Sequence, residues 1–574
     1  MKSEFGYVNN TIHVVVLFLT AGCGQDNPAE DAPGADSVYR NGRIYTVDDS
    51  RPWAEAVAIQ DGRIVFVGSD EAAEVHIGAH TDVFDLGGRL MLPAFQDSHI
   101  HPIYAGMEAA ACNLNGLSGL PEYRSAISAY ASANPDVPWI LGGGWSMAVF
   151  GPGGAPGREI IDELVPDRPV FLSSQDGHTG WANSAALRIA GIDKDTPDPA
   201  DGRIDRDPVS GEAIGSLQEG AMNLVTRHIP PDTLETRLAG LRYAMEMLHG
   251  YGITSIQDAI VNREELEAYA AMDERGQLEL RVVASLWWDR ERAEEQIADL
   301  LSMREQFTHG HVRPTTVKIM QDGVMENYTA AMLEPYLVPD RTRGIPMVEP
   351  EFLKHAVSLL DAEGFQVHFH AIGDAAVRQA LDAVEEAGRQ NGALGNRHHI
   401  SHLQMIDPDD IPRFGELDVV ANFQPLWAYP DKYVTELTIP FIGEERARWM
   451  YPIRSVVDSG GMIAFGSDWS VSTANPLPQI ETAITRMDVI SNEGEALIAE
   501  ERIDLETALA AFTINAAFVN KHEQQTGSVE VGKLADLIVI DRNLFEIEAK
   551  EISDAEVLLT LFEGRPVHGD PAAL

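Results

Sequence analysis

Cysteine is scarce in this sequence, which contains two, Cys23 and Cys112, among 574 residues. A disulfide framework needs several cysteines, so the small disulfide-stabilised folds are excluded. Basic residues are also few, with 42 Lys and Arg against 89 Asp and Glu, and the formal net charge is −47. Because so acidic a surface repels polyanions, the composition argues against nucleic acid and anionic lipid as partners and indicates a heavily hydrated, salt-tolerant protein.

A hydrophobic run long enough to span a bilayer is not evident near the N-terminus, where Val14–Leu19 is too short. This run leads into Thr20-Ala21-Gly22-Cys23, a pattern typical of a bacterial lipoprotein signal that is cleaved before Cys23 and lipidated on its sulfur. The acidic Glu4 beside Lys2 is atypical of such signals, so a mis-assigned start or a plain leader is the alternative.

From this pattern we expect residues 1–23 to be a lipoprotein-type signal peptide. The mature protein would be exported and membrane-anchored, on the periplasmic side, with the lipid on Cys23 as its membrane contact. Residues 24–36 are rich in Pro, Ala, Asp and Gly and are expected to form a flexible tether.

Two β-rich regions at opposite ends of the chain predict one composite β-sandwich. Residues 37–91 alternate short runs of β-forming residues with turns, and Asn41-Gly42 and Asp61-Gly62 predict hairpins. The run Ala535–Ile540 has the same character. We expect residues 37–91 and 525–574 to form the sandwich together.

The middle of the chain alternates strand patterns with amphipathic helical patterns. Eight strands are expected, in Leu92–Pro102, Ile253–Asp258, Arg281–Trp287, Thr316–Gln321, Gln366–His370, His399–Leu403, Val419–Gln424 and Met462–Asp468. Repeated βα units of this number predict an α/β fold, a (β/α)8 TIM barrel formed by residues 92–112 and 225–524. Residues 113–224 are too long for a normal βα connection, so we interpret them as a substrate-shaping subdomain inserted after the first strand.

Side chains that are costly to bury gather at the C-terminal ends of these predicted strands. His99 and His101 are spaced i, i+2 on the first strand, which puts two imidazoles on one face as half of a metal site. Later strands carry Lys318, His368, His370, His402 and Asp468. Singly, a strand histidine is usually a core residue, a lysine can reach solvent and an aspartate can cap a helix. Together, at successive strand ends, they favour a catalytic site.

This order of motifs resembles the amidohydrolase superfamily. The resemblance rests on the Pro-x-x-x-Asp-Ser-His-x-His run that ends at His101, on Gly466-Ser467-Asp468 and on Gly532-Lys533-Leu534-Ala535-Asp536. More narrowly, the chain is similar to amidohydrolase family 3, the branch of N-substituted formamide deformylase. That similarity rests on Ser173–His178, on His370–Asp374 and on Asp322-Gly323 with Thr329-Ala330-Ala331.

The resemblance implies a binuclear metal centre, with ligands His99, His101, Lys318, His370, His402 and Asp468. Lys318, carboxylated on its amine, would bridge the two ions, and Asp468 would also act as the catalytic base. His178 of the insert is a candidate for a substrate or oxyanion contact, with a polar residue of a Gly-rich turn as the alternative. His368 stays open as an alternative to His370, and His398 or His399 as an alternative to His402.

Histidine and carboxylate ligands suit Zn²⁺, and Mn²⁺, Fe²⁺, Co²⁺ or Ni²⁺ would also fit, as one ion or two. A metal-bound hydroxide would attack the carbonyl, and Asp468 would pass the proton to the leaving nitrogen. We therefore predict a metal-dependent amidohydrolase that cleaves a carbon–nitrogen bond, of the amide or formamide type and not a peptide bond, in a small-molecule substrate.

Several alternatives stay open at this point. An esterase, lactonase or dipeptidase would use the same metal site. A mononuclear deaminase is disfavoured because Lys318 is present and no glutamate closely follows His370. A non-catalytic solute-binding lipoprotein is disfavoured by the full ligand set and the base at Asp468. A homo-oligomer is compatible with the sequence.

Replacing Cys23 tests the predicted anchor. Cys23→Ala removes the sulfur that would carry the lipid, so we expect the variant to be released from membranes or to remain unprocessed. Membrane fractionation and N-terminal mass analysis measure this, with Cys112→Ala as the matched control. A native protein that is unlipidated and keeps its first residues would contradict the prediction.

Overall fold

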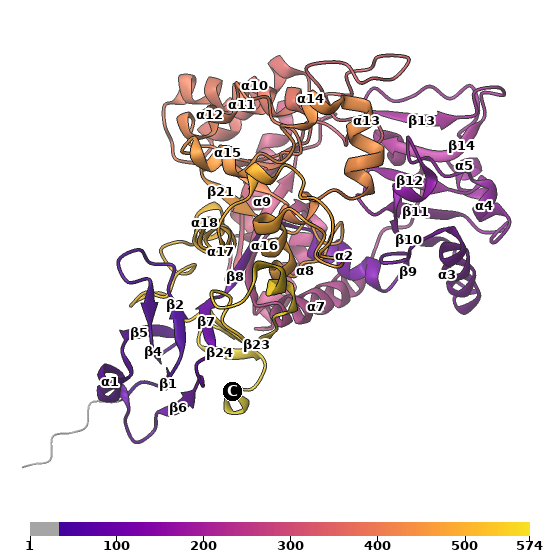
Figure 1. The fold of residues 1–574 in the computed structure, drawn as a ribbon. Coiled ribbons are helices and arrows are strands. Elements are labelled where there is room, and N and C mark those ends of the chain that lie inside the picture. The colour runs from indigo at the N-terminus through magenta and orange to yellow at the C-terminus, as the bar shows by residue number, and fades with distance from the viewer. Residues whose placement is uncertain (1–33) are drawn as a thin grey trace, which may run out of the picture.

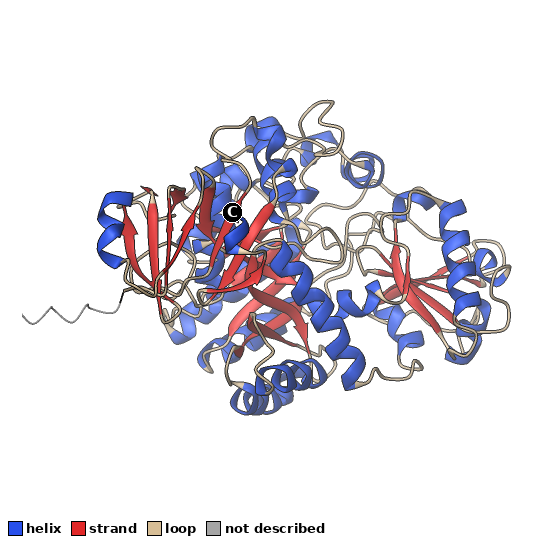
Figure 2. Cartoon of the chain, turned by 90° about the horizontal axis from the view of Figure 1, so that it is seen from below, coloured by secondary structure: helices blue, strands red, loops and turns tan. Residues whose placement is uncertain are grey.

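The computed structural model describes residues 34–574, so the predicted signal, Cys23 and most of the predicted tether lie outside the described residues. Figures 1 and 2 both show a central barrel between a β-sandwich on one side and an inserted subdomain on the other. None of the helices in residues 34–574 is long and apolar enough to cross a membrane.

The central element is a sheet of eight parallel strands. In sheet order these are β8 (Phe95–Ile100), β15 (Ile253–Val261), β16 (Arg281–Trp287), β17 (Val312–Met320), β18 (Gln366–Ala371), β19 (His399–His402), β20 (Val420–Phe423) and β21 (Ile463–Phe465). The sheet nearly closes, because the Asp468 N–H donates to the His99 carbonyl at 2.8 Å and the His101 N–H to the Trp469 carbonyl at 3.1 Å. The predicted (β/α)8 barrel is confirmed.

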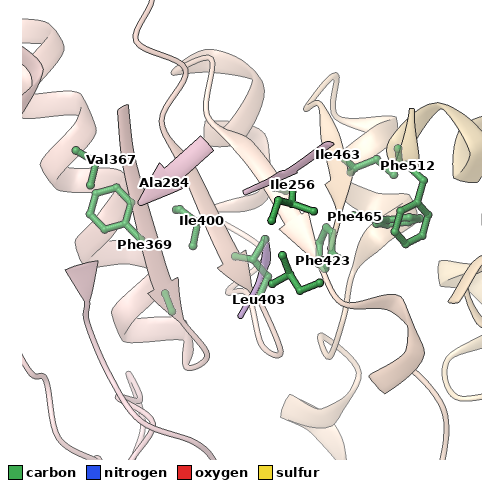
Figure 3. Close-up of a cluster of buried hydrophobic side chains, with 14 of the residues drawn as sticks. Ile256, Ala284, Val367, Phe369, Ile400, Leu403, Phe423, Ile463, Phe465 and Phe512 are labelled. Carbon is green, nitrogen blue, oxygen red and sulfur yellow. The ribbon is translucent and has the colours of Figure 1, made fainter. Parts of the chain in front are cut away.

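Helices cover the outside of the barrel. The main ones are α7 (Leu234–Gly250), α8 (Arg263–Glu274), α9 (Ile297–Phe307), α10 (Pro350–Ala362), α11 (Asp374–Asn391), α16 (Pro476–Thr485) and α17 (Leu505–Phe512). Alternation along each strand separates the two faces. In β18, Val367 and Phe369 belong to the apolar layer in Figure 3. His368 and His370 alternate with them and lie on the inner face, where His368 contacts His99 and His370 lines the active-site cavity. The same strand therefore supplies both core and site.

Both ends of the chain build the β-sandwich. One sheet holds β5 (Arg63–Gly68), β4 (Ala56–Gln60), β1 (Ser37–Arg40) and β6 (Asp82–Asp85). The other holds β24 (Arg565–His568), β23 (Val557–Phe562), β22 (Leu537–Ile540), β7 (Leu90–Pro93), β2 (Arg43–Tyr45) and β3 (Trp53–Ala54). Antiparallel pairing of β22 with β7 ties the C-terminal strands to the N-terminal ones just before the barrel begins.

Two expectations for this region need correction. The hairpin at Asp61-Gly62 is confirmed by the pairing of β4 with β5, but the hairpin at Asn41-Gly42 is wrong. There β1 pairs in one sheet and β2 in the other, so the turn carries the chain between sheets. Asn41 has a φ of 55°, which is compatible both with a hairpin and with a turn between two sheets. The strands with which β1 and β2 pair, which are distant in the sequence, decide between these two courses of the chain. Leu92, expected to open the barrel, lies in β7 of the sandwich.

The insert has its own six-stranded sheet above the barrel mouth. Its order is β13 (Gly202–Arg206), β14 (Ala213–Glu219), β12 (Thr179–Ala182), β11 (Val170–Ser174), β10 (Ile140–Trp145) and β9 (Cys112–Asn113). It follows α2 (Pro102–Ala109), the short helix after the first barrel strand. The Asn327 amide donates to Gln218 Oε1 at 2.8 Å, which joins β14 to the loop after β17 and holds this edge over the site.

The Asp536 side chain of the closing Gly-Lys-Leu-Ala-Asp motif joins the sandwich to the barrel. Arg281 at the start of β16 is 3% exposed and donates to Asp536 and, at 2.7 Å, to Glu563. Its guanidinium also lies 4.5 Å from the Phe562 ring centroid. Because both charges of the pair are buried, each depends on the other for compensation.

Breaking this pair should destabilise the protein. In Arg281→Met the Asp536 carboxylate stays buried without its partner, a loss of about 3–5 kcal/mol. Arg281→Met/Asp536→Leu should recover part of that loss because no charge is left unpaired. Thermal unfolding measures both, with the exposed Arg565→Met as the control, expected within about 0.5 kcal/mol of wild type. An Arg281→Met melting temperature equal to that of the control would contradict the assigned role.

Candidate metal centre and active-site cavity

A cavity of about 1490 Å³ opens at the C-terminal ends of the barrel strands, between the barrel and the insert. Its lining includes all six side chains expected as metal ligands, namely His99, His101, Lys318, His370, His402 and Asp468. Five different strands or strand ends contribute them, so the assembly exists only in the closed barrel.

Asp468 is the centre of this group. Its Oδ1 lies 3.0 Å from His101 Nε2 and 3.4 Å from His99 Nε2, and its Oδ2 lies 3.8 Å from His402 Nδ1. His99, His402 and Asp468 each offer a ligand atom within 4.8 Å of the others. Within residues 34–574, no donor makes an aligned hydrogen bond to Asp468 Oδ1 despite its burial. A buried carboxylate oxygen with imidazoles around it and no hydrogen bond fits a bound divalent cation.

Three histidines of the group, His99, His370 and His402, are held in the neutral form that ligates metals. Burial lowers the pKa of His99 to about 3, and Lys318 nearby lowers it further. Burial also holds the pKa values of His370 and His402 well below the usual range. The ring of His402 lies 4.6 Å from that of His99 and 4.4 Å from that of His370, between centroids. Neutral imidazoles this close are a suitable donor set for zinc or a similar ion.

Lys318 is buried among these groups, with 2% of its surface exposed. In the part of the chain that the structure describes, no side chain forms an ion pair or hydrogen bond with its Nζ. Burial lowers its pKa to about 7, and Asp468 opposes that shift. An unpaired ammonium at this depth is costly, so the neutral amine or an anionic derivative is favoured there.

The structure separates the histidines that the sequence left as alternatives. His368 does not line the cavity, and its ring lies below the site, with Nε2 2.8 Å from His99 Nδ1 and Nδ1 3.0 Å from Ser285 Oγ. His399 packs against His368, with ring centroids 4.0 Å apart. His398 accepts from the Val367 N–H at 3.0 Å and lies away from the cavity. The geometry therefore favours His370 and His402 as ligands and gives His368 the task of orienting His99.

Three further residues orient the group, and sequence reasoning did not assign them a role. Asp97 accepts from the N–H groups of His99 at 3.0 Å and Ser467 at 3.1 Å, which links the first strand to the last. Gln424 Oε1 lies 2.9 Å from His402 Nδ1. Asp322 lies 3.3 Å from His370 Nδ1 and accepts three backbone N–H groups, those of Ala331, Ile372 and Gly373. Asp97 and Asp322 belong to motifs that carry the family resemblance, so the sequence contained a signal that these two residues matter.

His178 reaches the cavity from the insert. Its ring lies 5.2 Å from that of His370, and its Nδ1 lies 2.9 Å from Glu219 Oε2. Burial alone would lower the pKa of His178, but Glu219 beside it raises the pKa to about 9. The other Glu219 oxygen accepts from the Thr329 hydroxyl at 2.7 Å. Glu219 was not noted in the sequence because it lies far from His178 along the chain.

A (β/α)8 barrel whose strand ends bring neutral imidazoles and carboxylates into one deep cavity defines a metal-dependent hydrolase. The amidohydrolase family model matches residues 82–568. The chain therefore belongs to the amidohydrolase family.

Individual relatives agree with this assignment. Protein LONG AFTER FAR-RED 3 of Arabidopsis thaliana is 33% identical, over 93% of this chain and 92% of its own. The N-substituted formamide deformylase of Arthrobacter pascens is 27% identical, over 92% of this chain and 97% of its own. A crystal structure of an uncharacterized metal-dependent hydrolase from Pyrococcus horikoshii OT3 is similar with a TM-score of 0.70 at 25% identity, covering 89% of this chain and 99% of that one.

Proposed function

We propose that the protein hydrolyses a carbon–nitrogen bond, of the amide or formamide type and not a peptide bond, in a small molecule. The observation that carries this proposal is the group around Asp468, where a buried carboxylate without a hydrogen bond on Oδ1 meets the imidazoles of His99 and His101. The similarity to an N-substituted formamide deformylase over nearly the whole chain supports the bond type.

The cavity also argues against substrates that carry a carboxylate, such as dipeptides and acyl amino acids. Besides histidines, Lys318 and Arg237 are the basic side chains among its lining residues. Lys318 belongs to the proposed metal centre, and Arg237 is engaged by Glu265 at 3.1 Å. Because neither is free to receive it, a substrate carboxylate would have to compete with Glu219 for His178, in otherwise acidic surroundings and at a high desolvation cost.

The proposed metal ligands are His99, His101, Lys318, His370, His402 and Asp468. When bound, one or two divalent ions, zinc foremost, would polarise the substrate carbonyl and lower the pKa of a water molecule. Asp468 would take the proton of the attacking water and deliver it to the leaving nitrogen, which a poor amine leaving group requires. Cationic His178, held by Glu219, would face the carbonyl oxygen as negative charge develops on it.

Lys318 would serve this centre as a carbamate. Its ammonium would release one proton to become the neutral amine, whose nitrogen would bond to the carbon of CO₂ and release a second proton. The two protons leave to solvent, and an anion with two oxygens replaces a buried positive charge. Its burial without a partner supports this, because the carbamate matches divalent cations and the ammonium does not.

Replacing Lys318 tests the bridged centre. Lys318→Ala should lose at least one metal ion and most of the activity, by roughly 10²-fold or more, because the anionic ligand is gone. Acetate or propionate in solution should partly restore both. Metal analysis and turnover measure this, with Lys354→Ala as the control, because Lys354 is only partly buried and does not line the cavity. A Lys318→Ala variant that keeps two metal ions and near-normal turnover would contradict the proposed bridging role of Lys318.

The bond type is tested with the metal-loaded protein on N-substituted formamides, N-acyl amines, dipeptides, lactones and esters. We expect turnover of a formamide or simple amide that is lost on chelation and restored by zinc or manganese. Asp468→Asn should lower amide hydrolysis by about 10²–10⁴-fold, and ester hydrolysis by less, because an alkoxide leaves with less help from an acid. Turnover of esters or lactones with none of any amide would overturn the proposed bond type.

A further inference from the structure

One end of the active-site cavity combines carboxylates with aromatic rings. It is lined by Asp176, Glu326, Asp431, Trp427, Tyr433 and Tyr451, which we name the acidic recess. Trp427 connects it to the metal centre, since its ring stacks on that of His402 with centroids 5.4 Å apart and planes 6° from parallel. The recess is therefore next to the reacting group and within reach of the same substrate.

Glu326 is the deepest carboxylate of the recess, with 5% of its surface exposed. Its Oε1 accepts from the Gln404 amide and from the Thr438 hydroxyl, both at 3.1 Å. Its Oε2 has no hydrogen-bond partner among the described residues. The side chain is thus fixed through one oxygen and leaves the other toward the cavity it lines.

Asp176 repeats this arrangement. Its Oδ1 accepts from the His178 N–H at 3.0 Å and from the Ser174 hydroxyl, whereas its Oδ2 is buried and has no partner in residues 34–574. Asp431 is anchored by the Val434 N–H, at 2.8 Å from Oδ1. Buried oxygens are nearly always satisfied in folded proteins, so the unpaired oxygen of the buried Glu326 beside this cavity indicates a missing donor.

No lysine or arginine of the described chain forms an ion pair with any of the three carboxylates. Burial raises the pKa of Asp431 to about 7, and Glu326 adds to that shift. Burial likewise raises the pKa of Glu326, with Asp176 adding to it. The carboxylates therefore repel one another, and a cation between them would relieve both the repulsion and the desolvation.

The aromatic rings select the kind of cation. Trp427, Tyr433 and Tyr451 line the same space, and ring faces attract organic ammonium groups through their quadrupoles. A small hydrated metal ion would instead need a shell of oxygen ligands and gains little from rings. We propose that the acidic recess binds a substituted ammonium group of the substrate, so that the substrate class is cationic amides. This inference adds a substrate class to the proposed function, and it rests on that function only for the type of bond that is cleaved.

Two isosteres that differ in charge alone test the recess on the metal-loaded protein. Choline and 3,3-dimethylbutan-1-ol have the same shape, with a quaternary nitrogen in one and a quaternary carbon in the other. We expect choline to bind about tenfold more tightly, because cation–π and carboxylate attraction act on it alone. Calorimetry or tryptophan fluorescence at fixed ionic strength measures both dissociation constants. Equal affinities would overturn the proposal.

Charge-removing variants locate the effect. Glu326→Gln and Asp431→Asn should each lower the preference for choline, and the double variant should bring the two affinities within about twofold. Glu436→Gln is the matched control, because Glu436 lies in the same segment Tyr433–Thr438 but is exposed and does not line the cavity. Metal content and near-UV circular dichroism verify folding, and Asp431→Asn alone suffices if the buried Glu326 variant is unstable. A preference that survives the double variant, or that falls equally in the control, would overturn the assignment.

A second pair separates this inference from the proposed function. N-[2-(trimethylammonio)ethyl]formamide and N-(3,3-dimethylbutyl)formamide carry the same isosteric groups next to a cleavable bond. We expect kcat/KM to favour the cationic formamide about tenfold, mainly through KM. If choline is preferred but neither formamide is cleaved, the recess stands and the proposed bond type fails. If both formamides are cleaved equally well, the bond type stands and the recess fails.

Discussion

Contact between the last barrel strand and the first is the constraint on which the rest of the structure depends. The Asp468 N–H donates a hydrogen bond to the His99 carbonyl, and the Asp97 carboxylate accepts hydrogen bonds from the N–H groups of His99 and Ser467. The bonds from Asp468 and Ser467 join residues about 370 positions apart along the chain. Because the same residues supply the convergent imidazoles and the carboxylate, closure of the barrel also assembles the candidate metal centre.

Burial then sets the chemistry of the site. At this depth the imidazoles of His99, His370 and His402 stay neutral. Among the described residues, the Lys318 amine has no ion-pair partner and a carboxylate oxygen of Asp468 has no hydrogen bond. The unpaired amine and the unpaired carboxylate oxygen are costly in an isolated protein, and all three features are favourable around a divalent cation. The cost is offset elsewhere, by the large apolar layer between strands and helices.

The insert contributes the part of the site that the barrel lacks. Through β14 it places Glu219 between His178 and Thr329, so a residue of the insert is tied to the loop after β17. The same loop presents Glu326, and the segment after β20 presents Trp427 and Asp431. The metal centre thus belongs to strand ends, whereas the pocket around it belongs to connections. Connections vary more freely than strands, which is how one barrel supports different substrates.

The barrel and the polar residues at its strand ends could be predicted from the sequence, because strand periodicity, helical spacing and the order of polar residues are local properties. The eight predicted strands overlap the observed ones, and the placement of His99, His101, Lys318 and Asp468 in one cavity follows from the rule that parallel strands end together.

The choice between His368 and His370 could not be made from the sequence, because both side chains share one face of β18 and only their depth in the barrel separates them. Asn41-Gly42 was assigned to a hairpin because a turn residue carries no information about its distant partners. Glu219, Gln424 and the acidic recess required the tertiary structure for the same reason: what makes each of them functional is a neighbour that is remote in the chain and close only after folding.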